Sequence, residues 1–457
     1  MYASQLPMPL QVNPVSLVAD PLHPSTRRTR SNGSANKLAP EDAPAHEWYR
    51  FVLSFPPHLV RDYIGRFSVG RDHTVMDPFC GTGTTLVECK KLGIPSVGIE
   101  ANPMAHFAAS TKTDWTPDPE ALSSHARHIA NNALRELAAQ GLEDVPAEVS
   151  SRSSIGTLDA LPPESHSLLL TNSISELPLH KTLLLLRSLA DDPEASFDRH
   201  EKLALAQALV SEISNLHFGP EVGVGKVKRD APVIGPWLTR VERIANDLRS
   251  LGNGTSTCAS AILGDSRSLP ETLSRTELDA VITSPPYPNE KDYTRTTRLE
   301  SVILGFVNSK DELRSLKRSF IRSNTRSVYK DDQDHAWVAG FPRIGQLADE
   351  IESRRRALGK TSGFERMYSR VTLLYFGGMA RHFESLRELL RPGAMLAYVV
   401  GDQASYLRVM IRTGQLLADI ARSLGYEVVG IDLFRTRTAT ATREQLREEV
   451  LVLRWPG

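Results

Sequence analysis

The 457-residue sequence contains few cysteines and no long apolar run. Its three cysteines, Cys80, Cys89 and Cys258, show no paired Cys or His spacing, which argues against both a disulfide framework and a zinc site. No stretch of about 18 apolar residues occurs, and the N-terminus lacks the charged, apolar and small-residue segments of a secretory signal. These absences predict a soluble cytoplasmic protein with no membrane segment and no bound metal.

The sequence also lacks a net charge, because 54 Lys and Arg residues balance 54 Asp and Glu residues. A polyanionic partner would therefore have to meet a local basic surface, since the field of the whole molecule attracts neither sign. The length suits one large domain with insertions, or two to three domains of about 150 residues each.

Composition and periodicity divide the chain into parts. Residues 1–44 are rich in Pro, Ser, Asn and Thr, which predicts a disordered N-terminal arm, either a solvated tail or an arm that touches phosphates. We expect residues 45–115 and 254–457 to form one α/β domain and 116–253 to form a largely helical insertion. Residues 309–370 are a basic loop and helix insertion within that domain. The arm carries a short basic cluster of Arg27, Arg28 and Arg30.

A βαβ unit begins soon after the arm. The run HTVMDPFCGTGTTLVECKKLGIPSVGIE predicts a strand at 74–76, a helix at 84–92 that Gly93 ends, and a strand at 96–99. Further strand patterns follow in ASAILGD, LDAVIT and GAMLAYVVGD, then a helix at 407–424 and two β-rich runs. Together they predict a Rossmann-like α/β sheet that is interrupted twice and ends in an antiparallel hairpin.

The ends of the predicted strands carry acidic residues beside a glycine turn. Gly81 and Gly83 would let the backbone approach a ligand, although such turns also bind dinucleotides or only close a strand-helix corner. Asp77 suits a ligand ammonium group, Glu100 suits ribose hydroxyls, and Asp265 suits an adenine amino group. Each acid alone is at least as well explained by a helix cap or an exposed carboxylate. In concert, the three favour a cationic, ribose-bearing ligand.

Two motifs carry a resemblance to a known family. DPFCGTGTT resembles the phenylalanine-glycine motif of amino-group DNA methyltransferases, and TSPPY resembles their catalytic tetrapeptide; the resemblance covers roughly residues 46–110 and 255–455. It implies a catalytic α/β domain with a methyltransferase sheet and S-adenosylmethionine as cofactor. The residues that the resemblance places around the cofactor are Asp77, Phe79, Gly81, Gly83, Thr84, Glu100 and Asp265.

The tetrapeptide suits transfer to a base amino group, which is a poor nucleophile because it is conjugated to its ring. The hydroxyl of Ser284 and the carbonyl of Pro285 can accept the amino hydrogens, and Pro286 helps to fix the backbone. Tyr287 offers an aromatic face to an extruded base. An isolated Pro-Pro-Tyr would instead indicate a stiff turn with a packed tyrosine.

The first residue of the tetrapeptide bears on the substrate. In the family Ser is typical of cytosine-N4 enzymes, whereas Asp or Asn is common in adenine-N6 enzymes, so Ser284 favours N4 of cytosine in double-stranded DNA. Carbon-5 methylation needs a nucleophilic Cys, and the sequence has no Pro-Cys pair. A restriction-modification or phage-defence system, with a cognate endonuclease or other subunits, is the implied setting. Adenine-N6 or RNA guanine methylation, and a non-catalytic DNA-binding protein with a relict cofactor pocket, remain alternatives.

Target recognition would have to lie in an insertion, either 116–253 or 309–370. The first contains a glycine-rich basic loop, and the spacing of basic residues in the second predicts one basic helix face, with a solvated face as the alternative. Tyr293 and Arg295, just past the tetrapeptide, would line the base pocket. The candidate DNA-binding residues are Lys226, Lys228, Arg229, Tyr293, Arg295, Lys317, Arg318, Arg322 and Arg326.

Overall fold

The structure is a computed structural model that describes residues 38–50, 54–145, 157–218, 221–252, 257–269, 273, 277–289, 291–438 and 445–457. The predicted arm as far as residue 37, with its three arginines, lies outside the described residues. No helix in the described ranges combines the length and the apolar character needed to cross a membrane.

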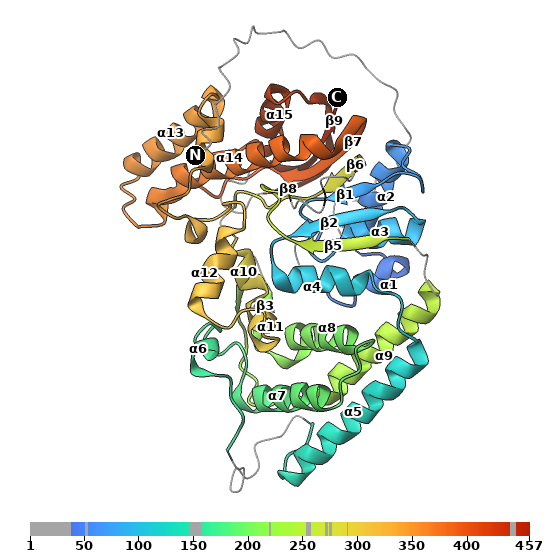
Figure 1. The fold of residues 1–457 in the computed structure, drawn as a ribbon. Helices are drawn as coiled ribbons and strands as arrows, with labels where there is room; N and C mark the ends of the chain where they lie inside the picture. The colour runs from blue at the N-terminus through green and yellow to red at the C-terminus, as the bar shows by residue number, and fades with distance from the viewer. Residues whose placement is uncertain are drawn as a thin grey trace, which may run out of the picture.

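Seven strands in the described part of the chain form one central sheet, in the order β5-β2-β1-β6-β7-β9-β8 (Figure 1). The strands from β5 to β7 in this order pair in parallel, whereas β9 pairs antiparallel with both β7 and β8. The predicted α/β fold with a terminal antiparallel hairpin is confirmed. The strand bounds are β1 Val75–Asp77, β2 Ser96–Glu100, β5 Ala259–Leu263, β6 Leu278–Thr283, β7 Leu390–Gly401, β8 Glu427–Thr438 and β9 Gln445–Arg454.

The strand order reverses between β1 and β6, because the chain adds β2 and β5 on one side of β1 and β6 and β7 on the other. In an open α/β sheet such a reversal leaves a crevice at the carboxyl ends of the strands, where ligands bind. The sheet topology alone therefore predicts that the site lies at this edge of the sheet.

Both faces of the sheet are covered, so its central strands are mostly apolar. Successive side chains of a strand point to opposite faces, and Ala280 and Ile282 accordingly pack with α2, whereas Val281 packs with α14 and α15. α13 packs against α14 and lies at the outer side of the molecule (Figure 1). The helices of this domain are α1 Ala43–His46, α2 Pro57–Arg66, α3 Thr84–Leu92, α4 Pro103–Lys112, α13 Pro342–Ala357, α14 Tyr368–Leu386 and α15 Thr413–Ser423.

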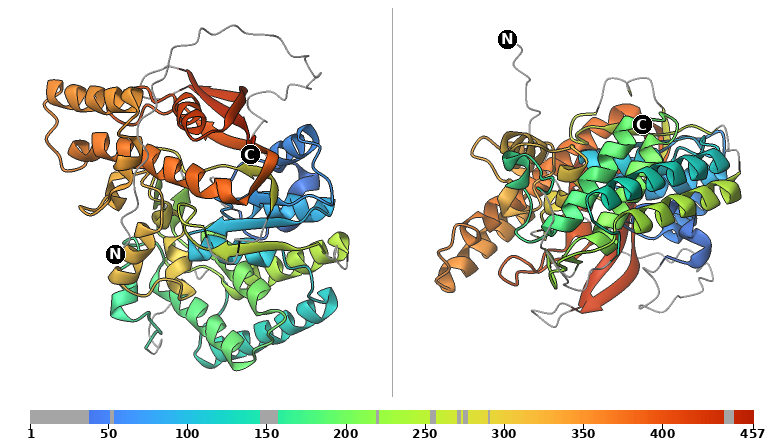
Figure 2. Two further views of the ribbon diagram at one scale, coloured as in Figure 1. Left: turned by 45° about the horizontal axis from the view of Figure 1, so that its top comes forward. Right: turned by 90° about the horizontal axis from the view of Figure 1, so that it is seen from below.

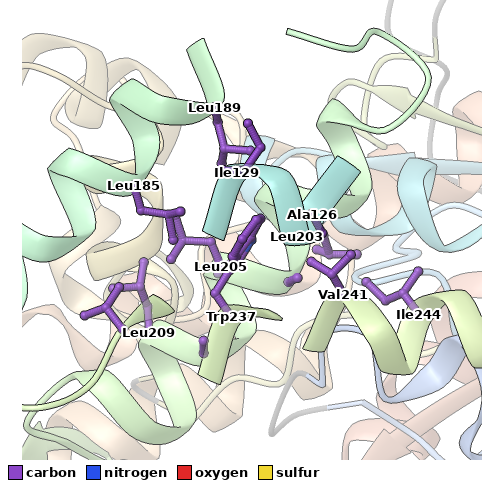
Figure 3. Packing of buried hydrophobic residues seen from close by; sticks show 14 of the residues in the cluster. Ala126, Ile129, Leu185, Leu189, Leu203, Leu205, Leu209, Trp237, Val241 and Ile244 are labelled. Carbon is purple, nitrogen blue, oxygen red and sulfur yellow. The ribbon is translucent and has the colours of Figure 1, made fainter. Parts of the chain in front are cut away.

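The chain between β2 and β5 forms a helical layer beyond α4 (Figures 1 and 2). Its long helices pack through apolar positions around Trp237, which is fully buried and donates its Nε1 hydrogen to the Glu201 carbonyl at 2.9 Å (Figure 3). A two-stranded hairpin of β3 and β4 is added, which the sequence pattern did not predict. The elements are α5 Pro119–Ala139, α6 Pro163–His166, α7 Glu176–Asp191, α8 Asp198–Ala208, β3 Leu216–Phe218, β4 Val222–Val224 and α9 Ile234–Leu251.

The basic segment 309–370 departs from its prediction. Following α10 Tyr293–Thr296 and α11 Arg298–Ile303, helix α12 covers only Lys310–Arg318, so the expected single basic face is wrong beyond Arg318. The Arg322 guanidinium turns back and donates to the carbonyls of Lys317 and Arg318 at 3.0 and 3.2 Å. Arg322 thereby satisfies carbonyls that the helix end leaves open.

The predicted helix at 407–424 begins later, at Thr413. Leu407 and Arg408 have φ angles of 55° and 63°, which a right-handed helix does not permit. A backbone bridge between Gln403 and Ile411 closes this loop at the end of β7. The bridge therefore separates this loop from the helix that follows it.

Candidate active site

A cavity of about 560 Å³ lies at the carboxyl edge of the sheet. Its wall includes the turn at 78–82, the end of β2 at 99–102 and the tetrapeptide at 284–287. Parallel strands end at the same edge, so the fold brings the glycine turn and the tetrapeptide to one site although about 200 residues separate them in the chain.

The two glycines of the turn have different surroundings. Gly81 has a φ of 53°, lines the cavity, and has no neighbouring atom within 4 Å of the position that a Cβ would occupy. Gly83 has a φ of 84°, and a Cβ there would lie 3.1 Å from Ala109 on α4. Gly81 therefore leaves backbone open to a ligand, whereas Gly83 lets α3 approach α4 and is absent from the cavity lining.

Asp77 is fully buried behind the turn and does not line the cavity. Its carboxylate accepts hydrogen bonds from the hydroxyls of Thr85 at 2.7 Å and Thr283 at 2.5 Å and from the Phe79 amide at 3.1 Å. Burial raises the pKa of Asp77 to about 6, although these three bonds oppose the rise. In this geometry Asp77 joins β1 to β6 and α3, and its contact with a ligand ammonium group stays a prediction.

Glu100 lies in the cavity wall at the end of β2. Oε2 accepts the Gly81 amide hydrogen at 2.8 Å and Oε1 accepts that of Asn102 at 2.7 Å. Burial raises the pKa of Glu100 to about 7, against the effect of these backbone bonds. Each carboxylate oxygen keeps a further lone pair, so the group can still accept hydrogen bonds from a pair of ribose hydroxyls.

Asp265 differs from Glu100 in that its carboxylate is already paired. Arg267 donates to it through Nε at 3.0 Å and Nη2 at 2.7 Å, and Arg267 also binds Asp334. The neighbours Gly264 and Ser266 line the cavity, but Asp265 does not. The adenine contact predicted for Asp265 stays a prediction.

Two further residues predicted at the cofactor line the cavity. Phe79 is held edge-on against His382, with ring centroids 4.8 Å apart, so one part of its ring remains at the cavity wall. Thr84 lines the wall at the first residue of α3. The methionine-end contact of Phe79 stays a prediction.

Ser284 follows β6 directly, and its Oγ donates to the carbonyl oxygen of Val399 on β7 at 3.2 Å. Because the hydroxyl hydrogen is used in this bond, the lone pairs of Oγ are left as acceptors. Pro285 and Pro286 have no amide hydrogen and restrict the backbone after Ser284. The geometry can therefore present two oxygens, the Ser284 hydroxyl and the Pro285 carbonyl, to an amino group.

Tyr287 and Tyr293 complete this side of the cavity. The Tyr293 hydroxyl oxygen accepts the Tyr287 amide hydrogen at 3.3 Å. Burial raises the pKa of Tyr293 to about 12 and also raises that of Tyr287, so both rings stay neutral near pH 7. Neutral aromatic rings suit an apolar face against which a base could stack.

The chain is similar in sequence to several known proteins. A family model described as DNA methylase matches residues 24–110. Type II methyltransferase M.BsoBI of Geobacillus stearothermophilus is 26% identical over 430 residues, 87% of this chain and 82% of that protein. Type II methyltransferase M.AvaI of Nostoc sp. is 24% identical over 474 aligned positions, 95% and 90% of the two chains. Type II methyltransferase M.MjaII of Methanocaldococcus jannaschii is 44% identical over 68 residues, 15% and 12%.

The family model and the relatives together support the assignment of this chain to the amino-group DNA methyltransferases. Membership of a methyltransferase family implies S-adenosylmethionine as the cofactor. The cavity fits such a group, because it offers an aromatic wall at Phe79, open backbone at Gly81 and a carboxylate at Glu100 within one space. No group of His, Cys, Asp or Glu residues that could hold a metal ion occurs in the described ranges of this methyltransferase.

The methyltransferase also brings to the cavity residues that no motif marked. Gln403 follows β7, Arg435 and Arg437 belong to β8, and Glu448 belongs to β9. Arg435 Nε lies 2.5 Å from Glu448 Oε2. Alternation places Arg435 and Arg437 on one face of a strand, but only the topology shows that this strand lies beside β7 and β9 at the site.

Of the candidate DNA-binding residues, Tyr293 lines the cavity and Arg295 lies beside it in α10. Arg295 Nε donates to the Val222 carbonyl at 3.1 Å and so holds β4 against α10. Glu221, which directly precedes β4, lines the cavity, as do residues 319–321 of the basic segment. Both insertions therefore contribute residues to the wall of the cavity.

The remaining candidates differ in the exposure of their side chains. Lys317 is bound to Asp292 at 2.8 Å, and Arg322 is 3% exposed with Asp332 at 2.7 Å, so the structure does not present the Arg322 charge to a phosphate. Lys228 donates its Nζ hydrogen to the Ser214 carbonyl at 2.8 Å. The candidates whose side chains are exposed are Lys226, Lys228, Arg229, Arg318 and Arg326.

Proposed function

We propose that this methyltransferase transfers the methyl group of S-adenosylmethionine to the exocyclic N4 of a flipped-out cytosine in double-stranded DNA. The observation that carries the proposal is the position of Ser284, whose hydroxyl lone pairs remain available as acceptors in the cavity that also contains Glu100. The family distinction between Ser and Asp or Asn at this position supports cytosine over adenine.

The chain has separate parts for the cofactor and for the base. Phe79, Gly81, Thr84 and Glu100 would hold the cofactor, with Asp77 fixing the turn from behind and Asp265 beside the wall. When bound, S-adenosylmethionine supplies an electrophilic sulfonium methyl group. The protein's part is to exclude water and to fix the amino nitrogen in line with that group.

The tetrapeptide would position the acceptor base. The Ser284 hydroxyl and the Pro285 carbonyl accept the two amino hydrogens, which draws electron density onto the nitrogen and orients its lone pair. Tyr287, with Pro286 beside it, lines the space in which the extruded ring would lie. Extrusion is required because the amino group is paired inside a duplex.

The biological setting follows from the relatives. Because M.BsoBI and M.AvaI are named Type II methyltransferases, we propose that this chain is the modification enzyme of a restriction-modification system, with a cognate endonuclease as its partner, and acts on DNA in the cytoplasm. The segment of the β3 and β4 hairpin and the basic segment 309–370 both contribute residues to the cavity wall, which supports a shared role in target recognition. Duplex phosphates would then meet the exposed basic residues on these two segments.

Nucleoside analysis tests the proposal. The purified protein is incubated with unmodified DNA and S-adenosylmethionine carrying an isotope-labelled methyl group, and the DNA is digested to nucleosides for mass spectrometry. We expect labelled N4-methyldeoxycytidine from the wild type, and its formation to be about 10²-fold to 10³-fold slower with Ser284→Ala. Label in N6-methyldeoxyadenosine alone would overturn the choice of base, and absence of label from DNA would overturn the activity.

A further inference from the structure

Gln403 is held in a defined position at the end of β7. Its backbone amide donates to the Ile411 carbonyl at 3.1 Å, and its carbonyl accepts from the Ile411 amide at 2.7 Å. The preceding Asp402 is fixed by Arg412, whose Nη1 lies 2.5 Å from Asp402 Oδ2. The Gln403 side chain is 3% exposed and lines the cavity. A buried side chain on so fixed a backbone has a definite orientation.

The orientation of the carboxamide follows from its neighbour. Gln403 Oε1 accepts a hydrogen bond from Arg437 Nη2 at 3.3 Å. Arginine only donates, so the oxygen must face Arg437 and the amino group must occupy the other position. Gln403 Nε2 is buried and has no hydrogen-bond partner among the described residues. Buried amide donors almost always have a partner, so this one requires an explanation.

The unpaired amino group lies at the catalytic end of the cavity. A Cβ at Gly401 would be 3.0 Å from Tyr287 Cε2 and 3.5 Å from Gln403 Nε2, so the ring and the amide lie around the same point. β6 and β7 are neighbours, and Ser284 is bonded to Val399 four residues before Gln403. The hydroxyl and the amide therefore leave the sheet from adjacent strand ends.

We propose that Gln403 is a specificity-determining residue, whose Nε2 donates a hydrogen bond to the ring nitrogen next to the amino group of the target base. Ser284 accepts from the amino group and Gln403 donates to its neighbour, so the pair matches a base edge with a donor beside an acceptor. Cytosine has this pattern at N4 and N3, whereas thymine and guanine present an acceptor beside a ring N–H. Arg437 holds the amide in the donating orientation.

This inference rests on the proposed function only in taking a base amino group as the methyl acceptor. Adenine has the same donor and acceptor order at N6 and N1, so the assignment of Gln403 does not depend on the choice between cytosine and adenine. A failure of the base assignment and a failure of the Gln403 assignment can therefore be separated.

The test uses Gln403→Met, which keeps the length of the side chain and removes the donor. The substrate is a duplex oligonucleotide with the recognition sequence mapped by modification-sensitive sequencing. We expect kcat/KM for methyl transfer to fall about 10-fold to 100-fold, because a buried base acceptor is left unpaired. The Kd of S-adenosylmethionine and the Tm stay near wild type. We expect a larger fall in kcat/KM for Gln403→Glu, because this variant presents an oxygen to the ring nitrogen.

Replacing the target cytosine with 3-deazacytosine separates recognition from a structural role. This base has a C–H group in place of N3, so we expect wild type and Gln403→Met to transfer methyl groups to it at equal rates and to bind it equally in fluorescence anisotropy. A wild-type rate of Gln403→Met on cytosine, or an undiminished difference on 3-deazacytosine, overturns the inference. If the wild type modifies adenine, the same comparison with 1-deazaadenine applies, and if it modifies no DNA, the proposed function has failed.

Discussion

The Ser284 hydroxyl donates to the Val399 carbonyl at 3.2 Å, which joins the ends of the adjacent parallel strands β6 and β7. This bond fixes where the hydroxyl hydrogen points and so decides that Ser284 acts as an acceptor toward any group in the cavity. The sequence identifies Ser284 only as part of a tetrapeptide, whereas the structure defines the orientation of its hydroxyl group.

Ser284→Ala should separate chemistry from cofactor binding. Removing the acceptor withdraws one of the two oxygens proposed to polarise the amino group, so we expect kcat/KM to fall by about 10²-fold to 10³-fold. The Kd of S-adenosylmethionine, measured by calorimetric titration, should change less than about twofold, because the other cavity residues remain. Ser260→Ala, on the exposed edge strand β5, is the matched control and should leave both quantities unchanged. A loss of cofactor affinity as large as the loss of kcat/KM in Ser284→Ala would contradict the separation of catalysis from cofactor binding.

Two glycine substitutions in one turn should differ in whether they mainly reduce stability or mainly weaken cofactor binding. Gly83→Ala places a Cβ 3.1 Å from Ala109 at a φ of 84°, so we expect the free energy of unfolding to fall by about 2–4 kcal/mol. Gly81→Ala meets no atom within 4 Å and carries only the cost of its left-handed backbone, about 1–2 kcal/mol. It adds a methyl group to a residue of the cavity wall, however, and should weaken cofactor binding more than Gly83→Ala does. Urea unfolding measures the stability of both variants, and calorimetric titration measures their affinity for the cofactor. A larger loss of stability in Gly81→Ala, or a larger loss of cofactor affinity in Gly83→Ala, would contradict the prediction.

The sequence predicted the ends of β1 and β2 to within one residue, because the local signals are strong there. The Gly93 stop, the βαβ spacing and the apolar run of β6 each follow from neighbouring residues. Gln403, Arg437 and the pairing of Asp265 depended on long-range contacts, which no local pattern contains.

The error in the basic segment has a similar cause. Basic residues from 310 to 330 follow near-helical spacing, but the pattern does not reveal that Arg322 folds back to cap α12 and pairs with Asp332. Periodicity predicts which residues would share a face if the helix continued. It does not predict where tertiary partners end the helix.

The raised pKa of Glu100 makes one component of stability depend on pH. Its folded pKa is about 7 and its usual value is 4.5, so between these values the folded protein holds a proton that the unfolded chain has released. The contribution of Glu100 to the free energy of unfolding is therefore present at low pH and is lost as the pH rises toward 7. Asp77 acts in the same direction, with a pKa of about 6.

Glu100→Gln isolates this effect, because glutamine does not titrate. Compared with the wild type, we expect the variant to become relatively more stable as the pH rises from 4.5 to 7, by up to about 1.4 kcal/mol per pH unit. Urea unfolding of both proteins at several pH values measures the difference. A difference in stability that stays constant with pH would show that Glu100 is ionised throughout the range.

Arg322 and Arg326 provide a matched pair for the DNA surface, because both belong to the basic segment but only Arg326 is exposed. Arg326 lies over the Phe364 ring at 5.8 Å and has its charge at the surface. Arg326→Ala should leave the Tm unchanged, weaken duplex binding and reduce the slope of log affinity against log salt by about 1.

Arg322→Ala should have the opposite profile. It leaves the half-buried Asp332 carboxylate without its arginine partner and the end of α12 without its cap, so we expect a loss of about 3 kcal/mol in the free energy of unfolding. The salt slope of the folded variant should match the wild type, because the Arg322 charge is already neutralised within the protein. Titration of a labelled duplex from 50 to about 200 mM salt, together with urea unfolding, measures both quantities. A reduced salt slope for Arg322→Ala at unchanged stability would mean that Arg322 leaves Asp332 to bind a phosphate.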